Sequence, residues 1–122
     1  MTTKYGCKVE EWAAAKREML VILADRARLG GMIPYSELVG RIETIRMEPD
    51  SYALAHMLGE VSEEEDAAGR GMLSVIVVHK VGDMQPGPGF FQLAKKLGRD
   101  TSDIPTCWIE ELKRVHRHWS KG

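Results

Sequence analysis

The stretch that decides the fold is Gly71-Met-Leu-Ser-Val-Ile-Val-Val-His-Lys80. Residues 72–78 are rich in β-branched side chains and do not alternate between apolar and polar, which predicts a strand covered on both faces. Downstream, Gly82-Asp83 predicts a turn, and Met84 begins a return strand that the following prolines keep short. A helix over residues 89–97 then places its apolar side chains inward. A single strand, a wing-like loop and a helix favour a small recognition domain over a catalytic barrel.

The remainder of the chain predicts helices. Apolar residues recur at helical spacing from Val9 to Leu29, and Gly30-Gly31 ends that helix. Met32-Ile33-Pro34-Tyr35 is expected to be a short extended segment, because a residue before proline is kept out of the α region. Further helices are expected over 36–43 with Ser36 as N-cap, over 52–58 ending at Gly59, from Ser62 with a capping box to Glu65, and over 107–120 with Thr106 as N-cap. The predicted fold is a mainly helical α+β domain spanning residues 1–122.

Composition indicates a globular domain that needs no metal or disulfide. The chain has 122 residues, of which 43% are hydrophobic and 29% charged. No apolar run approaches the ~20 residues that cross a bilayer, and the N-terminus lacks a secretory signal, so we expect a cytoplasmic protein that does not enter membranes. Cys7 and Cys107 lack a CxxC spacing and are expected to be reduced. The four histidines have no ligand spacing, so neither a metal nor another cofactor is expected.

The charges are unevenly distributed along the chain. The net charge is −1, which removes the simplest argument for nucleic-acid binding. Residues 47–69 contain seven acids and no Lys or Arg, whereas residues 95–122 contain seven basic residues and four acids. The sequence therefore predicts a polarised molecule with an acidic middle and a mildly basic C-terminal end.

The order of predicted elements resembles a winged helix-turn-helix. Within that superfamily it resembles the DNA-binding domain of alkylguanine-DNA alkyltransferases and alkyltransferase-like proteins over residues 9–98. Ile33-Pro-Tyr-Ser-Glu-Leu38 echoes that family's extended Val-Thr-Tyr-Gly-Glu-Leu segment, and 73–78 takes the place of its Pro-Cys-His-Arg-Val-Val strand. The resemblance implies a winged-helix fold with an added C-terminal helix. It does not imply alkyl transfer, because Ser74 replaces the reactive cysteine and the expected recognition helix, 52–58, lacks the family's arginine.

The candidate site residues are basic or aromatic side chains that suit nucleic acid. Lys113, Arg114 and Arg117 form a basic cluster near Trp119, in which cations can contact phosphate while the ring stacks. Tyr52 and His56 lie four residues apart and share a helix face. The full set of nucleic-acid-binding candidates is Arg41, Arg46, Tyr52, His56, Lys80, Lys113, Arg114 and Arg117. The segment Gly87–Gly89 before a helix is open to two interpretations, an anion site or a rigid turn.

Two functions remain open from the sequence. In the first, a non-catalytic domain binds DNA through the winged-helix scaffold, and in the second the same scaffold binds a protein partner and no nucleic acid. An enzyme is not expected, because the chain has no paired carboxylates, nucleophile elbow or phosphate loop. Catalysis would require a buried polar cluster around Ser74, His79 and His56. The oligomeric state also stays open, with a homodimer through the exposed part of the Trp108 and Trp119 stripe as one interpretation.

Overall fold

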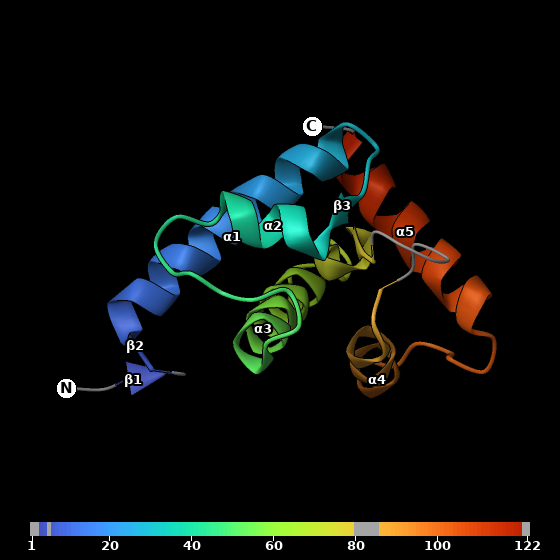
Figure 1. Ribbon diagram of the computed structural model, residues 1–122. Helices are drawn as coiled ribbons and strands as arrows, with labels where there is room; N and C mark the ends of the chain where they lie inside the picture. Colours follow the sequence, from blue (N-terminus) through green and yellow to red (C-terminus); the bar gives the residue numbers. More distant parts are fainter. Residues whose placement is uncertain (1–2, 5, 80–85, 121–122) are drawn as a thin grey trace.

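The computed structural model describes residues 3–4, 6–79 and 86–120 and shows a mainly helical α+β fold (Figure 1). Two antiparallel strands of two residues each, β1 (Thr3–Lys4) and β2 (Cys7–Lys8), precede the first helix. The other described elements are α1 (Val9–Arg28), β3 (Ile33–Pro34), α2 (Tyr35–Arg41), α3 (Tyr52–Ala67), the 3₁₀ helix η1 (Leu73–Ile76), β4 (Val77–Val78), α4 (Pro88–Lys96) and α5 (Ile104–Ser120).

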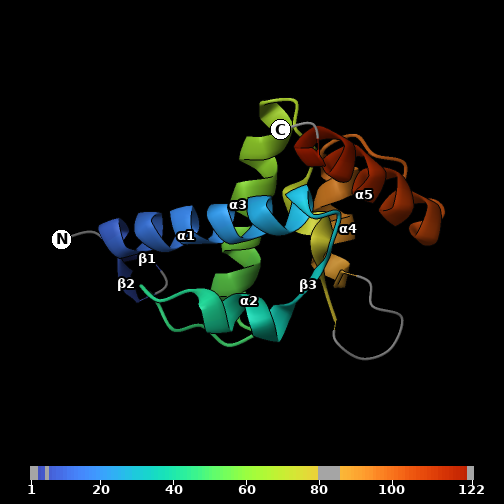
Figure 2. The same ribbon diagram turned by 90° about the horizontal axis from the view of Figure 1, so that it is seen from above.

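Helix α1 crosses the molecule and contacts α2, α3, α5 and η1 (Figure 2). Its buried stripe, which includes Trp12, Met19 and Leu23, has the helical spacing predicted from the sequence. Acidic residues in its first turn and basic residues in its last turn complement the helix dipole. The helix ends at Arg28, and Gly30 follows the C-cap Leu29 with a φ of 70°, a left-handed conformation that glycine adopts without strain. The first predicted helix is therefore confirmed.

Residues 72–78 are buried as predicted, but they are not the predicted strand. Leu73–Ile76 form a 3₁₀ helix, and only Val77 and Val78 pair with a neighbour, in parallel with Ile33 and Pro34. The reason is that β3 has two residues, because Pro34 has no N–H for a ladder and α2 starts at Tyr35. With no longer partner strand, the backbone before Val77 forms its hydrogen bonds within a tight turn. The predicted turn at Gly82-Asp83 and return strand at Met84 lie outside the described residues.

Helix α3 corrects the prediction of two short helices. It runs unbroken through Gly59, from an N-cap at Ser51, whose hydroxyl accepts the Leu54 N–H at 3.2 Å. Ser62 is not a cap, because it lies buried in the middle of the helix. The glycine costs roughly 1 kcal/mol in a helix interior, and burial of Leu58 and Val61 on either side offsets that cost.

Helix α5 belongs to the core of the fold. Cys107, Glu111 and Val115 are buried, and the helix packs against α1 and η1 (Figure 2). It begins at Ile104, so Thr106 is not the predicted N-cap but lies inside the first turn. The other predicted cap, Ser36, is also displaced, because α2 starts at Tyr35 after Pro34.

Candidate functional site

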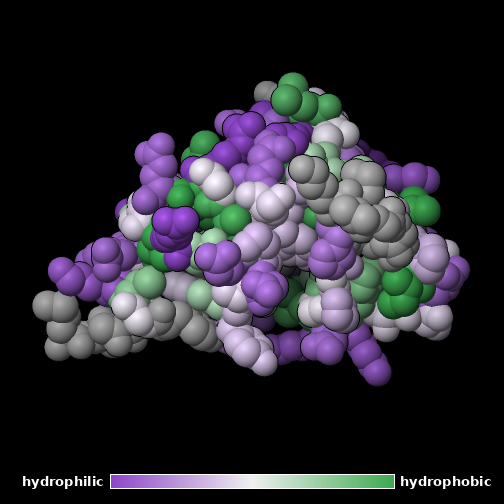
Figure 3. Space-filling view, in the orientation of Figure 1, coloured by the Kyte–Doolittle hydropathy of each residue, from purple (hydrophilic) through white to green (hydrophobic). Residues whose placement is uncertain are grey.

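A cleft of about 790 Å³ lies between α3 and α4. Figure 3 shows it as a hollow with hydrophobic side chains at its floor on the face viewed in Figure 1. Leu54 and Leu58 of α3 and Phe90 and Leu93 of α4 supply apolar lining. Its volume lies in the range of roughly 300–1,000 Å³ that small-molecule sites occupy. The cleft is therefore the candidate binding site of the described part of the chain.

Polar groups converge at the end of the cleft where β3 and β4 meet. The rings of Tyr35 and His79 lie 5.1 Å apart between centroids and are tilted by 39°. The Tyr35 hydroxyl accepts a hydrogen bond from the Gly87 N–H at 2.9 Å. A Cβ atom at Gly87 would lie 3.5 Å from both His79 Nε2 and Tyr35 Oη, an ordinary van der Waals distance, so Gly87 lies beside both groups. Tyr35, His79 and Gly87 thus form one polar wall.

The Tyr35 hydroxyl keeps its proton and can donate a hydrogen bond to a ligand. Burial raises the pKa of its phenol, more than the Gly87 N–H lowers it. The hydroxyl therefore stays neutral at physiological pH. Because it accepts from Gly87, its own O–H can donate to a group placed in the cleft.

The segment 87–90 offers little to an anion. The Gly87 N–H is bound by Tyr35, Pro88 has no N–H, and the Phe90 N–H donates to the Gly87 carbonyl at 3.1 Å. Three of these four backbone positions therefore present no donor to a ligand. The geometry favours the rigid-turn interpretation of Gly87–Gly89 over the anion site.

The three residues around which a catalytic cluster would have to form all lie in the cleft. Ser74, His79 and His56 all line it. The Ser74 hydroxyl is 2.6 Å from the hydroxyl of Ser62, whose oxygen also accepts the Ser74 N–H at 3.0 Å. A second hydroxyl is not a general base, so this pair ties η1 to α3 rather than activating a nucleophile.

The acidic residues of α3 are bound to cations of other elements. Lys16 of α1 lies 3.3 Å from Glu60 and 2.6 Å from Glu64, and Lys96 of α4 lies 3.6 Å from Glu63. Further along, Glu65 pairs with Arg70, and Asp66 pairs with Arg99. The acids of α3 therefore do not form a surface of unpaired negative charge. Their ion pairs hold α3 against its neighbours and leave the cleft less negative than the sequence indicates.

The predicted site residues near the cleft differ in their roles. His56 lines the cleft, whereas Tyr52 lies outside its lining and is 86% exposed. Arg46 is exposed between α2 and α3. Arg41 is exposed but forms an ion pair with Glu37, with 2.9 Å between Nη2 and Oε2. Lys80 lies outside the described residues.

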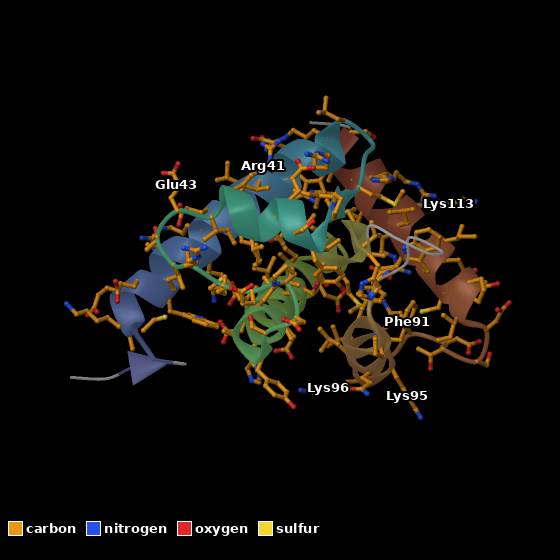
Figure 4. The ribbon with its side chains drawn as sticks, in the orientation of Figure 1. Arg41, Glu43, Phe91, Lys95, Lys96 and Lys113 are labelled. Atoms are coloured by element: carbon orange, nitrogen blue, oxygen red, sulfur yellow. The ribbon has the colours of Figure 1, made fainter. Side chains whose placement is uncertain are left out.

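The predicted basic cluster on α5 is separate from the cleft. Lys113, Arg114 and Arg117 are exposed and are not among the residues that line the cleft. Figure 4 shows Lys113 and Arg41 on different sides of the molecule, with Lys95 and Lys96 projecting from α4. Trp119, expected to stack on a ligand, instead packs under Arg28, whose guanidinium lies 5.2 Å from the ring centroid. The predicted cations therefore do not converge on one surface.

Sequence reasoning did not select Tyr35 and Gly87 as site residues. Tyr35 is part of the extended segment that resembles the alkyltransferase-type domain, and Gly87 is part of the segment open to an anion site or a rigid turn. The sequence carries no signal that the two residues meet. The parallel pairing of β3 with β4 produces this proximity in the structure.

Comparisons with protein-family profiles, curated proteins and solved structures give no match for this chain. Within the described residues, no group of three or more His, Cys, Asp or Glu side chains could hold a metal ion. No helix in the described ranges is long and apolar enough to cross a membrane. Cys7 and Cys107 are not joined by a disulfide. The function is therefore argued from the geometry of the cleft and the distribution of charge.

Proposed function

We propose that the chain is a cytoplasmic, non-catalytic nucleic-acid-binding domain of the winged-helix type, which holds an unpaired base in the cleft between α3 and α4. The order of α1, β3, α2, α3 and β4 supports the winged-helix assignment, since it follows the order of that superfamily. Fold alone is a weak argument for function, so the proposal depends on the cleft.

The observation that carries the proposal is the Tyr35 and His79 ring pair at the wall of an apolar cleft. An unpaired base needs flat apolar or aromatic surfaces for its faces and polar groups for its edge. The apolar side chains of α3 and α4 and the His79 ring supply the first, and the Tyr35 hydroxyl supplies the second. Stacking of a base on an aromatic side chain contributes about 1–3 kcal/mol.

The charges around the cleft are compatible with a nucleic-acid strand. Glu60 and Glu63, which line the cleft, are held by Lys16 and Lys96. The Lys96 side chain is 72% exposed, so its ammonium, 3.6 Å from Glu63, can face a phosphate beside the bound base while it stays paired with that carboxylate. The acids of α3 therefore do not exclude a polyanion from the cleft mouth.

Fluorescence anisotropy with labelled single-stranded and duplex oligonucleotides tests the proposal. We expect tighter binding to single strands, because their bases enter the cleft without unpairing. His79→Ala should weaken binding by about 5- to 150-fold, the equivalent of about 1–3 kcal/mol. Tyr52→Ala is the matched control, since it removes an exposed ring of α3 that does not line the cleft, and it should leave affinity unchanged.

A second function is favoured by Tyr52 itself. An aromatic ring that is 86% exposed at the start of α3 is typical of a protein-contact residue. If no oligonucleotide binds at low ionic strength, the nucleic-acid proposal is wrong and a protein-interaction module on the same scaffold becomes the better explanation. If Tyr52→Ala weakens binding and His79→Ala does not, the ligand contacts α3 outside the cleft.

A further inference from the structure

Seven cations of the described residues are held in ion pairs within the molecule. They lie in α1, α2, α4 and the loops that follow α3 and α4: Lys16, Arg26, Arg28, Arg41, Arg70, Lys96 and Arg99. A cation in such a pair has less charge to offer a partner. The cations outside ion pairs are therefore the ones to examine for a second binding surface.

Two such cations lie one helical turn apart on α5. Lys113 and Arg117 are exposed and form no ion pair with another described residue. Residues four apart share a helix face, so both side chains project in the same direction. Arg114, beside them, is 54% exposed, and its nearest carboxylate oxygen, on Glu111, is 3.9 Å away. We call these three residues the α5 basic face.

The fold holds the α5 basic face in a fixed position. The opposite side of the helix is buried through Glu111 and Val115. His116 lies 2.9 Å from the Gly31 carbonyl through its Nε2 atom, and Trp119 packs against Arg28 at the end of α1. Three separate contacts therefore fix the rotation of α5. A surface held in this way presents its charges without an entropic cost of ordering the helix.

The helix dipole does not account for the whole face. Cations near a C-terminus are favoured by the dipole, but the effect fades beyond the last turn. The helix ends at Ser120, so Lys113 lies seven residues, or about two turns, before its end. Glu110 is the exposed acid of this helix and precedes all three cations. The second half of α5 therefore carries a uniform positive charge that helix stability does not require.

We propose that the α5 basic face docks the phosphate backbone of a nucleic acid, as a second contact apart from the cleft. This inference rests on the proposed function, because the occupant is the same strand whose base enters the cleft. Charge complementarity supports it: three neighbouring cations suit successive phosphates, and none lines the cleft. Lys113 projects from α5 on the outer side of the molecule, where a long ligand can reach it (Figure 4).

The salt dependence of binding tests the inference. Each phosphate neutralised contributes about 0.7 to the slope of log affinity against log salt for a single strand, and about 0.9 for a duplex. Lys113→Gln with Arg117→Gln should therefore lower the slope measured with a labelled single-stranded oligonucleotide by about 1.4. Lys8→Gln with Arg17→Gln removes the same charge from exposed positions at and near the start of α1 and should leave the slope unchanged.

The outcomes separate this inference from the proposed function. His79→Ala should lower affinity without changing the slope, because it removes stacking and no phosphate contact. If the α5 variant binds with the wild-type slope while His79→Ala weakens binding, the α5 basic face is not a docking surface and the cleft proposal stands. If the wild type binds no oligonucleotide, both proposals are wrong. If Lys8→Gln with Arg17→Gln lowers the slope of log affinity against log salt by the same amount, the effect comes from net charge. The α5 basic face would then not be the docking surface.

Discussion

Single charged side chains join elements that are distant in the sequence. Arg26 of α1 donates to the Met32 carbonyl at 2.7 Å and also binds the carboxylate of Glu37, which Arg41 contacts as well. These contacts fix the chain between α1 and α2, just before the strand that positions Tyr35. The sequence shows basic and acidic residues between positions 26 and 41 but does not show which of them form ion pairs.

Glu37 should make the stability of the fold sensitive to acid. The hydrogen bond from Arg26, followed by the charges of Arg26 and Arg41, lowers its pKa from the ordinary value of 4.5. The stabilisation is therefore complete above the unfolded pKa and is lost as pH falls through the lower folded pKa. We expect Glu37→Gln to reduce the free energy of unfolding at neutral pH by an amount that shrinks below pH 4.5. Urea denaturation across pH measures this.

The control for this experiment is Glu48→Gln, which neutralises an exposed carboxylate outside the ion pairs of the described chain. It should give no pH-dependent difference. A difference between wild type and Glu37→Gln that stays the same at every pH would show that the side-chain shape, and not the charge, is responsible.

Arg99 should be the most sensitive charged position. Its guanidinium Nε donates to the carboxylate of Glu111 at 2.9 Å, and that carboxylate, which is 1% exposed, also accepts the Met72 N–H at 2.8 Å. The hydrogen bonds that Arg99 donates to Glu111 and then to Asp66 raise the pKa of Arg99 against the effect of burial. Arg99→Met leaves a buried, uncompensated charge and should cost about 3–5 kcal/mol in denaturant unfolding.

A matched comparison separates burial from charge. Lys96→Met breaks the exposed pair with Glu63, which should cost less than about 1 kcal/mol. Adding Glu111→Gln to Arg99→Met removes the stranded charge while keeping an acceptor for Met72, so the double variant should recover part of the loss. Equal costs for Arg99→Met and Lys96→Met would show that the Glu111 network contributes no more than a surface pair.

At the level of elements, the sequence predicted burial better than backbone conformation. The run 72–78 is fully buried as its apolar composition indicates, but a strand also needs a partner, and periodicity carries no information about the partner's length. Similarly, a glycine in a helical sequence marks the end of the helix only when tertiary packing does not outweigh the free-energy cost of glycine in a helix interior. Leu58 and Val61 pack in the core on both sides of Gly59, and α3 continues.

Two glycine substitutions test this account of α3. A Cβ at Gly59 would meet the Leu93 side chain at 4.0 Å, an ordinary contact, so Gly59→Ala should stabilise the protein by roughly 0.5–1 kcal/mol. At Gly71, φ is 87° and a Cβ would lie 3.1 Å from Glu111 Oε2, so Gly71→Ala should destabilise it. Thermal unfolding measures both. No gain from Gly59→Ala would indicate that the helix is interrupted there, as the sequence predicted.

At the scale of the whole molecule, the candidate site depends on contacts that the sequence does not reveal. Tyr35 and Gly87 are 52 residues apart, and their hydrogen bond follows from the parallel pairing of β3 with β4. Composition could predict the acidic character of residues 47–69, but not that Lys16 would pair with Glu60 and Glu64 and Lys96 with Glu63. The basic face of α5 was predictable, because helical periodicity places its cations together without reference to other elements.

The position of α5 in the core leads to a prediction about the minimal folding unit. The resemblance to a winged-helix domain covers residues 9–98 and would make α5 dispensable. In the structure, Glu111 holds the Met72 N–H, Val115 is fully buried, and α5 packs along α1. A chain ending at residue 103 would expose the core face of α1 and leave the buried Met72 N–H without its acceptor.

We therefore expect the chain truncated after residue 103 to lose cooperative unfolding and dispersed amide signals in NMR spectra. Removing residues 1–6 should have little effect, because the described part of that segment contributes only the short β1 strand. Adding a separate peptide of residues 104–120 should restore the native spectrum, since its apolar face would refill the space beside α1 and η1. A truncated chain that folds cooperatively alone would show that the winged-helix-like portion has a core of its own, and α5 would then be an accessory that presents its basic face.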